Sequence, residues 1–480
     1  MKYRIEGDSL GEKKISTDKY YGVQTVRALE NFKISNIPLG SRHKLIKALA
    51  AIKHAAALTN FELGLLDRVK TNAIIKAAQE VYDGKYYDQF PIDVIQGGAG
   101  TSCNMNVNEV ICNRALEIMG YKKGEYKYLH PNNHVNLSQS TNDVYPTAIR
   151  IALIWSTPEF IESIVSLRDA FYAKADEFKD IIKIGKTQLQ DAVPMTLGQE
   201  FKAFGVTINE DTERLREILT LCYEINMGAT AIGTGINTLP GYAETVTRHL
   251  SNVTGLSLKE APNLIEATSS TGVFVSFSSL LKRTAVKLTK ICNDLRLLSS
   301  GPKAGLYQIN LPAVQPGSSI MPAKINPVIP EVVNQVCFLV MGYDTTITAA
   351  ASAGQLQLNA FGPVIVYCLF EAMTLLKKAC IVLKEKCVDG ITANKEHCAQ
   401  EVLDSPGLLT AFTPYIGYEE AAKIAKLAQT SNKSVYEVIK KSGLLSDKDI
   451  ETILSPVTMT SPHARFDIVS KVRAKKEKSK

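Results

Sequence analysis

Apolar side chains recur at every third or fourth residue along three long stretches of this 480-residue chain. This spacing places them on one face of an α-helix. The stretches cover residues 195–227, 281–298 and 369–387. A helix of about 30 residues extends for about 45 Å, and helices of that length pack at small crossing angles in bundles. The sequence therefore predicts a mainly α protein with a long-helix bundle as its core.

One segment is apolar on more than one face of its predicted helix. Residues 364–370 read Val-Ile-Val-Tyr-Cys-Leu-Phe. The bundle of a single chain would struggle to cover both sides of such a helix. We therefore expect a homo-oligomer whose subunits meet through the long helices. The alternative is a deep core helix in a monomer.

Strand patterns are confined to the N-terminus. Residues 3–6 and 14–17, separated by Gly7 and Gly11, predict one small β-hairpin. Everything else is expected to be helical. The chain divides into a mostly helical domain with substrate loops at residues 1–142, a central long-helix bundle at 143–394, and a small C-terminal helical domain with a lysine-rich tail at 395–480.

The net charge of +7 is concentrated at the C-terminal end. Without the six cations and one anion of the last ten residues, the charge of the body is about +2, which is too little for a nucleic-acid groove. We expect no nucleic-acid partner and a solvated tail. The six cations are Lys471, Arg473, Lys475, Lys476, Lys478 and Lys480.

Nine cysteines are scattered along the chain, and no two are three residues apart, so there is no CxxC pair. This arrangement indicates buried, reduced thiols in a cytosolic protein. The first residues lack the apolar segment of a signal peptide, and no apolar run reaches the ~18 residues of a membrane span. We expect a soluble, cytoplasmic protein that does not contact a membrane.

Motifs for nucleotide and metal sites are absent. No GxGxxG follows a strand, and residues 228–233 have P-loop spacing but are followed by Thr234 instead of lysine. Of the seven histidines, only His130 and His134 are close in sequence, and the two asparagines between them are weak metal ligands. We expect no metal ligands in this chain.

Three polar stretches, the first of them glycine-rich, each precede a helical segment, at residues 96–106, 130–143 and 317–327. A helix start carries unpaired N–H groups and a partial positive charge, which favour an anion. Serine, threonine and asparagine add donors with little bulk, and glycine allows a ligand to approach closely. Asn326 followed by Pro327 predicts an N-cap with proline at the first helical position. Together the stretches indicate a compact carboxylate ligand.

The third stretch carries the most informative pattern. Its glycine, paired serines, Met321 and Pro322 predict a mobile loop, and Lys324 supplies a cation for a carboxylate. Ser318 has no histidine neighbour and no GxSxG elbow, so it is not a hydrolase nucleophile. It could act as a base only if surrounding N–H donors and Lys324 stabilised its alkoxide.

This stretch, Gly-Ser-Ser-Ile-Met-Pro-Ala-Lys-Ile-Asn-Pro at residues 317–327, resembles the signature loop of the fumarase/aspartase superfamily of lyases. The resemblance runs from residues 20–23 to residues 390–394. Within the superfamily, residues 97–102, 140–143, 187–201 and 354–359 look like the aspartase branch. The resemblance implies the three-domain, long-helix fold of that superfamily and the reversible elimination of ammonia from L-aspartate to give fumarate. It implies no required cofactor and leaves activation by a divalent cation such as Mg²⁺ open.

The resemblance also implies a role for each site residue. Ser318 is the general base that takes a proton from Cβ of L-aspartate, and the resulting charge spreads into the β-carboxylate as an aci-carboxylate. Three chains contribute to each site of the family, which implies a homotetramer. The donors to the aci-carboxylate are Thr101, Ser140, Thr141 and Ser319; Asn142 and Thr141 hold the amino group; and Thr187, Lys324 and Asn326 bind the α-carboxylate.

Gln188 favours elimination of ammonia over hydration. Fumarases carry a histidine at this position, as do some aspartases, and a neutral glutamine cannot accept a proton from attacking water. We expect Gln188 to orient the substrate. His134 lies in a segment that resembles one near a secondary carboxylate site, but Asn133 stands where aspartate is usual. Two alternatives are a class II fumarase and a catalytically inert structural homologue.

Overall fold

The computed structural model describes residues 2–460, 462, 468–470 and 474. Contacts divide the chain into two compact units, each built from three segments. The domain boundaries that we expect near residues 142 and 394 stay a prediction. Unit 1 is made of the described residues of Met1–Glu162, Asp211–Ala285 and Phe338–Lys377, and unit 2 of those of Ser163–Glu210, Val286–Cys337 and Lys378–Lys480.

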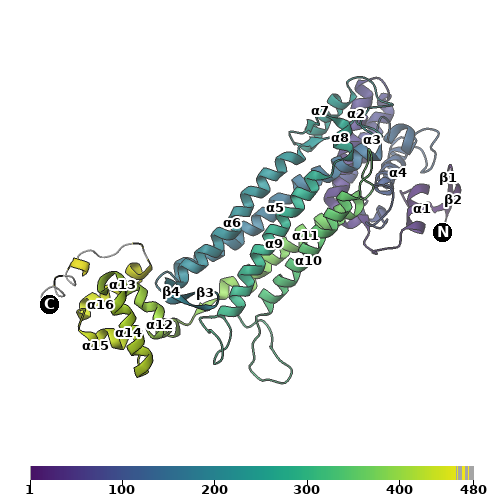
Figure 1. Cartoon of the computed structure of the whole chain (residues 1–480). Coiled ribbons are helices and arrows are strands. Elements are labelled where there is room, and N and C mark those ends of the chain that lie inside the picture. Colours follow the sequence, from purple (N-terminus) through teal and green to yellow (C-terminus); the bar gives the residue numbers. More distant parts are fainter. Residues whose placement is uncertain (1, 461, 463–467, 471–473, 475–480) are drawn as a thin grey trace. The chain divides into compact units, whose positions relative to one another are not determined.

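Five long helices contribute residues to both units, and within each unit they lie side by side (Figure 1). In unit 2, for example, the rings of Phe171, Phe178, Phe201 and Phe204 pack with centroids between 5.2 and 6.2 Å apart. The predicted mainly α, long-helix fold is confirmed. The five helices are α5 (Thr141–Glu177), α6 (Leu197–Cys222), α9 (Gly272–Leu298), α10 (Val328–Ser352) and α11 (Gly362–Lys386).

Polar contacts fix the position of α10 against α9. In unit 1, Ser278 Oγ and Lys282 Nζ donate to the two oxygens of Asp344 at 2.8 and 2.6 Å. In unit 2, Asn334 Nδ2 donates to Asn293 Oδ1 at 2.7 Å. Sliding one helix along the other would leave the buried side chains of Ser278, Asp344 and Asn334 unpaired, so the contacts select one register.

Elsewhere in unit 1, helix α2 (His43–Glu62) packs against α3 (Arg68–Tyr82) and α7 (Tyr242–Thr254). The predicted N-terminal hairpin is confirmed, because β1 (Tyr3–Asp8) pairs antiparallel with β2 (Gly11–Ser16). Short helical turns occupy Leu39–Ser41, Tyr87–Gln89 and Pro131–Val135. The other elements are α1 (Val23–Asn31), α4 (Thr101–Ile118), α8 (Leu264–Ser269), and the parallel pair β5 (Glu224–Ile225) and β6 (Lys259–Glu260).

The C-terminal helices of unit 2 share one hydrophobic core with Ile184 of the strand β3 (Ile182–Thr187). The cations of the predicted lysine-rich tail, residues 471, 473, 475, 476, 478 and 480, lie outside the described residues. The other elements are β4 (Gln190–Thr196), β7 (Ile309–Asn310), β8 (Thr392–Ala393), α12 (Lys395–Asp404), α13 (Leu409–Ile416), α14 (Tyr418–Ser431), α15 (Val435–Ser442), α16 (Asp447–Ile453), α17 (Pro456–Thr460), and turns at Val388–Gly390 and Pro406–Leu408.

The expectation that strands are confined to the N-terminus is wrong. Strands β3 and β4 form a second antiparallel hairpin in unit 2. Its two turn residues, Gln188 and Leu189, have positive φ angles of 51° and 62°. Such turns are usually made by asparagine and glycine, so the sequence gives no turn signal here. Met195, at the start of a predicted helical stretch, therefore lies in β4, and α6 begins at Leu197.

All nine cysteines are buried and unpaired, as the sequence predicted. Burial raises the pKa of the thiols, for example to about 12 for Cys103 and about 11 for Cys222. Within the part of the chain that the structure describes, no helix is both long enough and apolar enough to cross a membrane.

An ion pair in unit 1 holds α4 against α3. Arg114 Nε and Nη2 donate to the two carboxylate oxygens of Glu80 at 2.6 and 3.1 Å. The hydrogen bond from Arg114 lowers the pKa of Glu80, although desolvation opposes the shift. Since α4 begins at the first polar stretch, this pair also helps to position that stretch.

We predict that Glu80→Gln lowers the free energy of unfolding by about 2 kcal/mol at neutral pH. The pKa of Glu80 is lower in the folded chain than its ordinary value of 4.5. Its stabilisation is therefore present above about pH 4.5 and is lost as the pH falls through the lowered pKa. Urea unfolding over a series of pH values below neutral checks this, because the difference between the variant and the wild type should shrink as the pH falls below about 4.5.

The matched control is Glu217→Gln. The pair that Glu217 forms with Arg214 is exposed, with 57% and 52% of the two side chains accessible. This substitution should change the free energy of unfolding by less than about 0.5 kcal/mol. Equal losses in the two variants would contradict the role assigned to the Glu80–Arg114 pair.

Candidate active site

The first polar stretch turns sharply into α4. Gly98, Ala99 and Gly100 have φ angles of 91°, 56° and 94°. A Cβ atom on Gly100 would lie 2.5 Å from the ring of Tyr145 in α5, so both the backbone conformation and the close approach require glycine. Thr101 begins the helix, is exposed, and donates its hydroxyl hydrogen to the carbonyl of Gly98 at 2.7 Å.

The second polar stretch meets the first in unit 1. Thr141 is the first residue of α5 and is 8% exposed. Its Oγ1 accepts a hydrogen bond from Nδ2 of Asn104, one turn after Thr101 in α4, at 3.2 Å. The backbone N–H of Asn142 donates to Ser140 Oγ at 3.2 Å. The structure thus brings together the starts of α4 and α5, where four of the predicted site residues lie.

The side chain of Asn142 has a defined orientation. Its Nδ2 donates to the carbonyl of Ala231 at 2.7 Å. The backbone carbonyl of Asn142 in turn accepts from Nδ2 of Asn226 at 3.1 Å. One hydrogen of the Asn142 amide is therefore used by Ala231, and the carboxamide oxygen can accept a hydrogen bond from a ligand.

A buried lysine lies behind the starts of both helices. Lys53 of α2 is 0% exposed, and its Nζ donates to Oδ1 of Asn104 at 2.6 Å, Oε1 of Gln139 at 2.8 Å and Oδ1 of Asn136 at 3.0 Å. Burial lowers the pKa of Lys53 to about 7, and the negative charge of Asp143 opposes this shift. Our sequence interpretation missed Lys53. The available signal was a lysine within a run of alanines, since Ala50, Ala51, Ala55 and Ala56 are all buried.

Asp143 is a second buried charge, also 0% exposed. Its carboxylate accepts from the backbone N–H groups of Ser140 at 2.9 Å, Gly228 at 3.2 Å and Thr230 at 3.0 Å. Burial raises the pKa of Asp143 to about 7, while these hydrogen bonds oppose the shift. Residues 228–233, which have P-loop spacing, thus donate backbone hydrogen bonds to an aspartate of the same chain.

Ser318 lies in the loop that precedes α10, in unit 2. Its Oγ accepts hydrogen bonds from the backbone N–H groups of Ile320 at 3.2 Å and Met321 at 3.0 Å. Two N–H donors on one hydroxyl oxygen stabilise negative charge on that oxygen. At the base of the loop, the N–H of Gly317 donates to the carbonyl of Lys324 at 2.8 Å.

The predicted N-cap role of Asn326 is wrong. Helix α10 begins at Val328, and the N–H of Glu331 donates to the carbonyl of Pro327, so Pro327 occupies the cap position. The side chain of Asn326 instead donates through Nδ2 to the carbonyl of Gly317 at 2.5 Å. Asn326 therefore closes the Ser318 loop on itself.

Two cavities in unit 2 adjoin this loop. One of about 490 Å³ is lined by residues that include Ser318 and Lys324. The other, of about 730 Å³, is lined by Lys324 and Asn326 together with Ser299 and Ser300. Ser319 and Lys324 are exposed. The loop therefore presents a hydroxyl, an ammonium and an amide around open space.

Thr187 and Gln188 lie elsewhere in unit 2, at the tip of the β3–β4 hairpin, and both are exposed. The predicted site residues thus fall into three groups. Thr101, Ser140, Thr141 and Asn142 lie at the helix starts of unit 1. Ser318, Ser319, Lys324 and Asn326 lie in one loop of unit 2, and Thr187 and Gln188 at its hairpin tip.

The ring nitrogens of His130 and His134 accept hydrogen bonds from nearby backbone N–H groups. His130 Nδ1 accepts from the N–H of Asn132 at 3.1 Å, and His134 Nδ1 accepts from the N–H of His130 at 2.8 Å. Among the described residues, no three His, Cys, Asp or Glu side chains are grouped so as to hold a metal ion.

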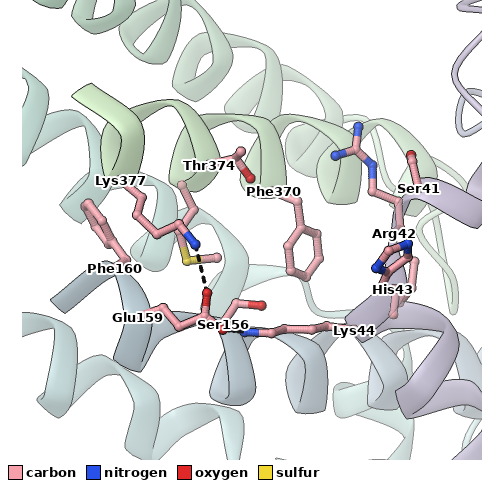
Figure 2. Close-up of a pocket in the computed structure, with 12 residues that line it drawn as sticks. Ser41, Arg42, His43, Lys44, Ser156, Glu159, Phe160, Phe370, Thr374 and Lys377 are labelled. Atoms are coloured by element: carbon pink, nitrogen blue, oxygen red, sulfur yellow. Dashed lines mark hydrogen bonds and ion pairs between the residues drawn. The ribbon is translucent and has the colours of Figure 1, made fainter. Parts of the chain in front are cut away.

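A further cavity of about 210 Å³ in unit 1 is lined by residues of α2, α5 and α11 and by Ser41 and Arg42 just before α2 (Figure 2). Its cations are paired with carboxylates: Lys377 Nζ lies 2.8 Å from Glu159 Oε2, Lys44 also pairs with Glu159, and Arg42 pairs with Glu371. Figure 2 shows the Lys377 amine directed at Glu159. None of the predicted site residues lines this cavity.

Comparison with known families decides the membership of the chain. A model of a lyase family matches residues 11–342, more than half of the sequence. This chain belongs to that lyase family. A model of the fumarase C C-terminus matches residues 408–461 of the same lyase.

Curated relatives match this lyase over nearly its whole length. Aspartate ammonia-lyases from Helicobacter pylori and Pseudomonas aeruginosa are 54% and 55% identical to it over 461 and 460 residues, which cover 96% of this chain and 98% and 97% of theirs. The aspartate ammonia-lyase of Escherichia coli K12 is 52% identical over 460 residues, 96% of each chain.

Solved structures match the fold of this lyase over the same extent. A fumarate lyase:delta crystallin from Brucella melitensis bound to cobalt has a TM-score of 0.93 and 54% identity, covering 96% of this chain and 100% of that one. A class II fumarase from Schistosoma mansoni has a TM-score of 0.89 and 36% identity, again covering 96% and 100%.

Proposed function

We propose that this lyase is an aspartate ammonia-lyase, which converts L-aspartate reversibly to fumarate and ammonia. One observation carries the proposal. The chain is 52–55% identical to curated aspartate ammonia-lyases along 96% of its length, against 36% for the class II fumarase. The three polar stretches supply the donors, the cation and the serine that such a reaction requires.

The reaction begins at Ser318. Its alkoxide takes a proton from Cβ of L-aspartate, and the electron pair of the broken C–H bond passes into the β-carboxylate. The N–H groups of Ile320 and Met321, which donate to Ser318 Oγ, lower the free energy of the alkoxide. Lys324 in the same loop adds a positive charge. These contacts support Ser318 as the base although it has no histidine partner.

The aci-carboxylate formed in this step carries two negative charges, and it needs several preoriented donors. We assign Thr101, Ser140, Thr141 and Ser319 to it; the Thr101 hydroxyl must first turn away from the carbonyl of Gly98 to donate. The first three lie at the starts of α4 and α5, where backbone N–H groups and the helix dipoles also favour an anion. The aci-carboxylate then collapses: its electron pair forms the double bond of fumarate, and the Cα–N bond breaks to release ammonia.

The other polar groups bind the parts of the substrate that do not lose a proton. We assign the carboxamide oxygen of Asn142 to the amino group, because its amide nitrogen is already bonded to Ala231. Thr187, Lys324 and Asn326 bind the α-carboxylate. Gln188, at the exposed hairpin tip, orients the substrate. A glutamine cannot activate water, which supports ammonia elimination over the hydration that a fumarase catalyses.

Ultraviolet absorbance tests this function. Purified protein mixed with L-aspartate should generate the absorbance of fumarate, and the reverse reaction should consume fumarate when ammonia is supplied. L-malate is the matched control substrate, because it differs in carrying a hydroxyl in place of the amino group. Activity with malate and none with aspartate would establish a fumarase. No activity with either substrate would indicate an inert homologue.

We predict that Ser318→Ala lowers kcat for L-aspartate by about 10³-fold or more, because it removes the base. Steady-state kinetics measure the loss, and the oligomeric state should be unchanged. Ser431→Ala is the control: Ser431 is exposed, and its Oγ donates to the carbonyl of Leu427 within α14. Wild-type turnover in the Ser318 variant would remove this residue from its assigned role.

We also propose that the protein is a homotetramer whose sites combine residues of three chains. The exposed positions of the 25-residue helix α10 carry no charge, and they include Phe338 at 57% and Leu339 at 52% accessibility. A helix face of this composition needs a covering surface. The exposed positions are Val332, Gln335, Phe338, Leu339, Gly342, Thr345, Thr346, Thr348, Ala349 and Ser352.

Phe338→Glu should therefore dissociate the tetramer and abolish turnover, because a buried unpaired carboxylate costs several kcal/mol per interface. Sedimentation velocity measures the mass of the assembly. Leu427→Glu is the control, since Leu427 is 55% exposed but lies on α14 of the C-terminal region. An unchanged mass in the Phe338 variant would exclude this face of α10 from the interface.

The location that we propose is the cytoplasm. It is supported by nine buried, unpaired thiols, which match a reducing compartment. Fractionation of the source cells tests it, because the protein should be recovered with cytoplasmic marker enzymes.

A further inference from the structure

The ammonium group of Lys53 is surrounded by three side-chain amides. Its Nζ donates to Asn104 Oδ1 at 2.6 Å, Gln139 Oε1 at 2.8 Å and Asn136 Oδ1 at 3.0 Å. An ammonium group has three donors and no acceptor. Each amide must therefore turn its oxygen towards Lys53 and its NH₂ group away. While Lys53 is protonated, this one buried cation fixes the orientation of all three amides.

This orientation is passed to Thr141 through Asn104. With its oxygen on Lys53, Asn104 directs Nδ2 at Asn136 Oδ1, 3.1 Å away, and at Thr141 Oγ1, 3.2 Å away. An amide NH₂ can only donate, so the Thr141 hydroxyl must accept this bond. Its own hydrogen is then left for a different partner. Asn104 is 1% exposed and Thr141 8% exposed, so solvent has little access to either group.

We infer that Lys53 and Asn104 are positioning residues that set the direction of the Thr141 hydrogen bond, so that Thr141 donates to a carboxylate oxygen of the substrate. The inference rests on the proposed function, which places Thr141 in the substrate site, and it makes that assignment more specific. A hydroxyl hydrogen presented in this way suits an anionic oxygen that only accepts and does not suit an ammonium group. Thr141 therefore serves the carboxylate, and the amino group is left to the oxygen of Asn142.

The direction of the bond can be separated from ordinary packing by two substitutions at one position. Asn104→Asp keeps the shape of the side chain and its bond with Lys53, but it turns a second acceptor oxygen towards Thr141. The Thr141 hydroxyl must then donate to that carboxylate and loses its hydrogen for the substrate. Asn104→Ala removes the contacts with Lys53, Asn136 and Thr141 and leaves the hydrogen of Thr141 free. If direction matters, the aspartate variant is the worse enzyme; if only packing matters, the alanine variant is worse.

The experiment compares kcat and KM for L-aspartate in the full-length wild type and in Asn104→Asp, Asn104→Ala and Thr141→Val, with folding checked by thermal unfolding. We expect Asn104→Asp to lose about 10²-fold in kcat, comparable to the loss of one oxyanion donor, and to be at least about 10-fold slower than Asn104→Ala. We also expect Asn104→Asp to change kcat by less than about 3-fold when it is added to Thr141→Val, since the hydrogen that it diverts is already absent.

An aspartate variant as active as the alanine variant, or more active, would overturn the inference. So would a full additive loss in the double variant. If Asn104→Asp does not fold, Asn104→Ala carries the test, because it must retain more kcat than Thr141→Val. The proposed function fails separately: a wild type without turnover of aspartate refutes the reaction, and a Thr141→Val variant with wild-type kcat refutes the assignment of Thr141 to the site.

Discussion

Burying the ammonium group of Lys53 inside unit 1 costs several kcal/mol unless its hydrogens all find acceptors. Three amide oxygens meet this requirement, one from α4 and two from the stretch before α5. In meeting it, the three side chains lose their freedom to rotate, and α2, α4 and the loop before α5 are held in one arrangement. The geometry of the candidate site residues in unit 1 follows from the need to satisfy this one buried charge.

The carboxylate of Asp143 applies the same constraint from the other side. It is also fully buried, and its acceptors are satisfied by backbone N–H groups of Ser140, Gly228 and Thr230. Backbone donors cannot rotate away as side chains can, so the loop after β5 is fixed against the start of α5. The carboxamide of Asn142, bonded to Ala231 of that loop, inherits its orientation from this arrangement. Lys53 and Asp143, both fully buried, therefore hold together segments that lie far apart in sequence.

The helices were predictable because apolar residues spaced three and four apart mark the buried face of each helix. The polar stretches were equally visible, since short polar side chains gather before each helix start. The β3–β4 hairpin was invisible because its turn is built from Gln188 and Leu189 in a conformation that usually belongs to asparagine and glycine. Asn326 matched the local N-cap pattern but bonds across the loop to Gly317. Lys53 was missed because its partners lie 51 to 86 residues away, a distance that no local pattern records.

The burial of the cysteines has a consequence for how long such an enzyme lasts. A thiol attacks disulfides and electrophiles through its thiolate, and the raised pKa of Cys103, Cys112 and Cys292 keeps these groups protonated at physiological pH. Sulfur chemistry that would damage or regulate an exposed cysteine is thereby blocked as long as the helices stay packed. Oxidation of these cysteines is then limited by the rate at which the fold opens, so that helix packing sets the chemical lifetime of the thiols.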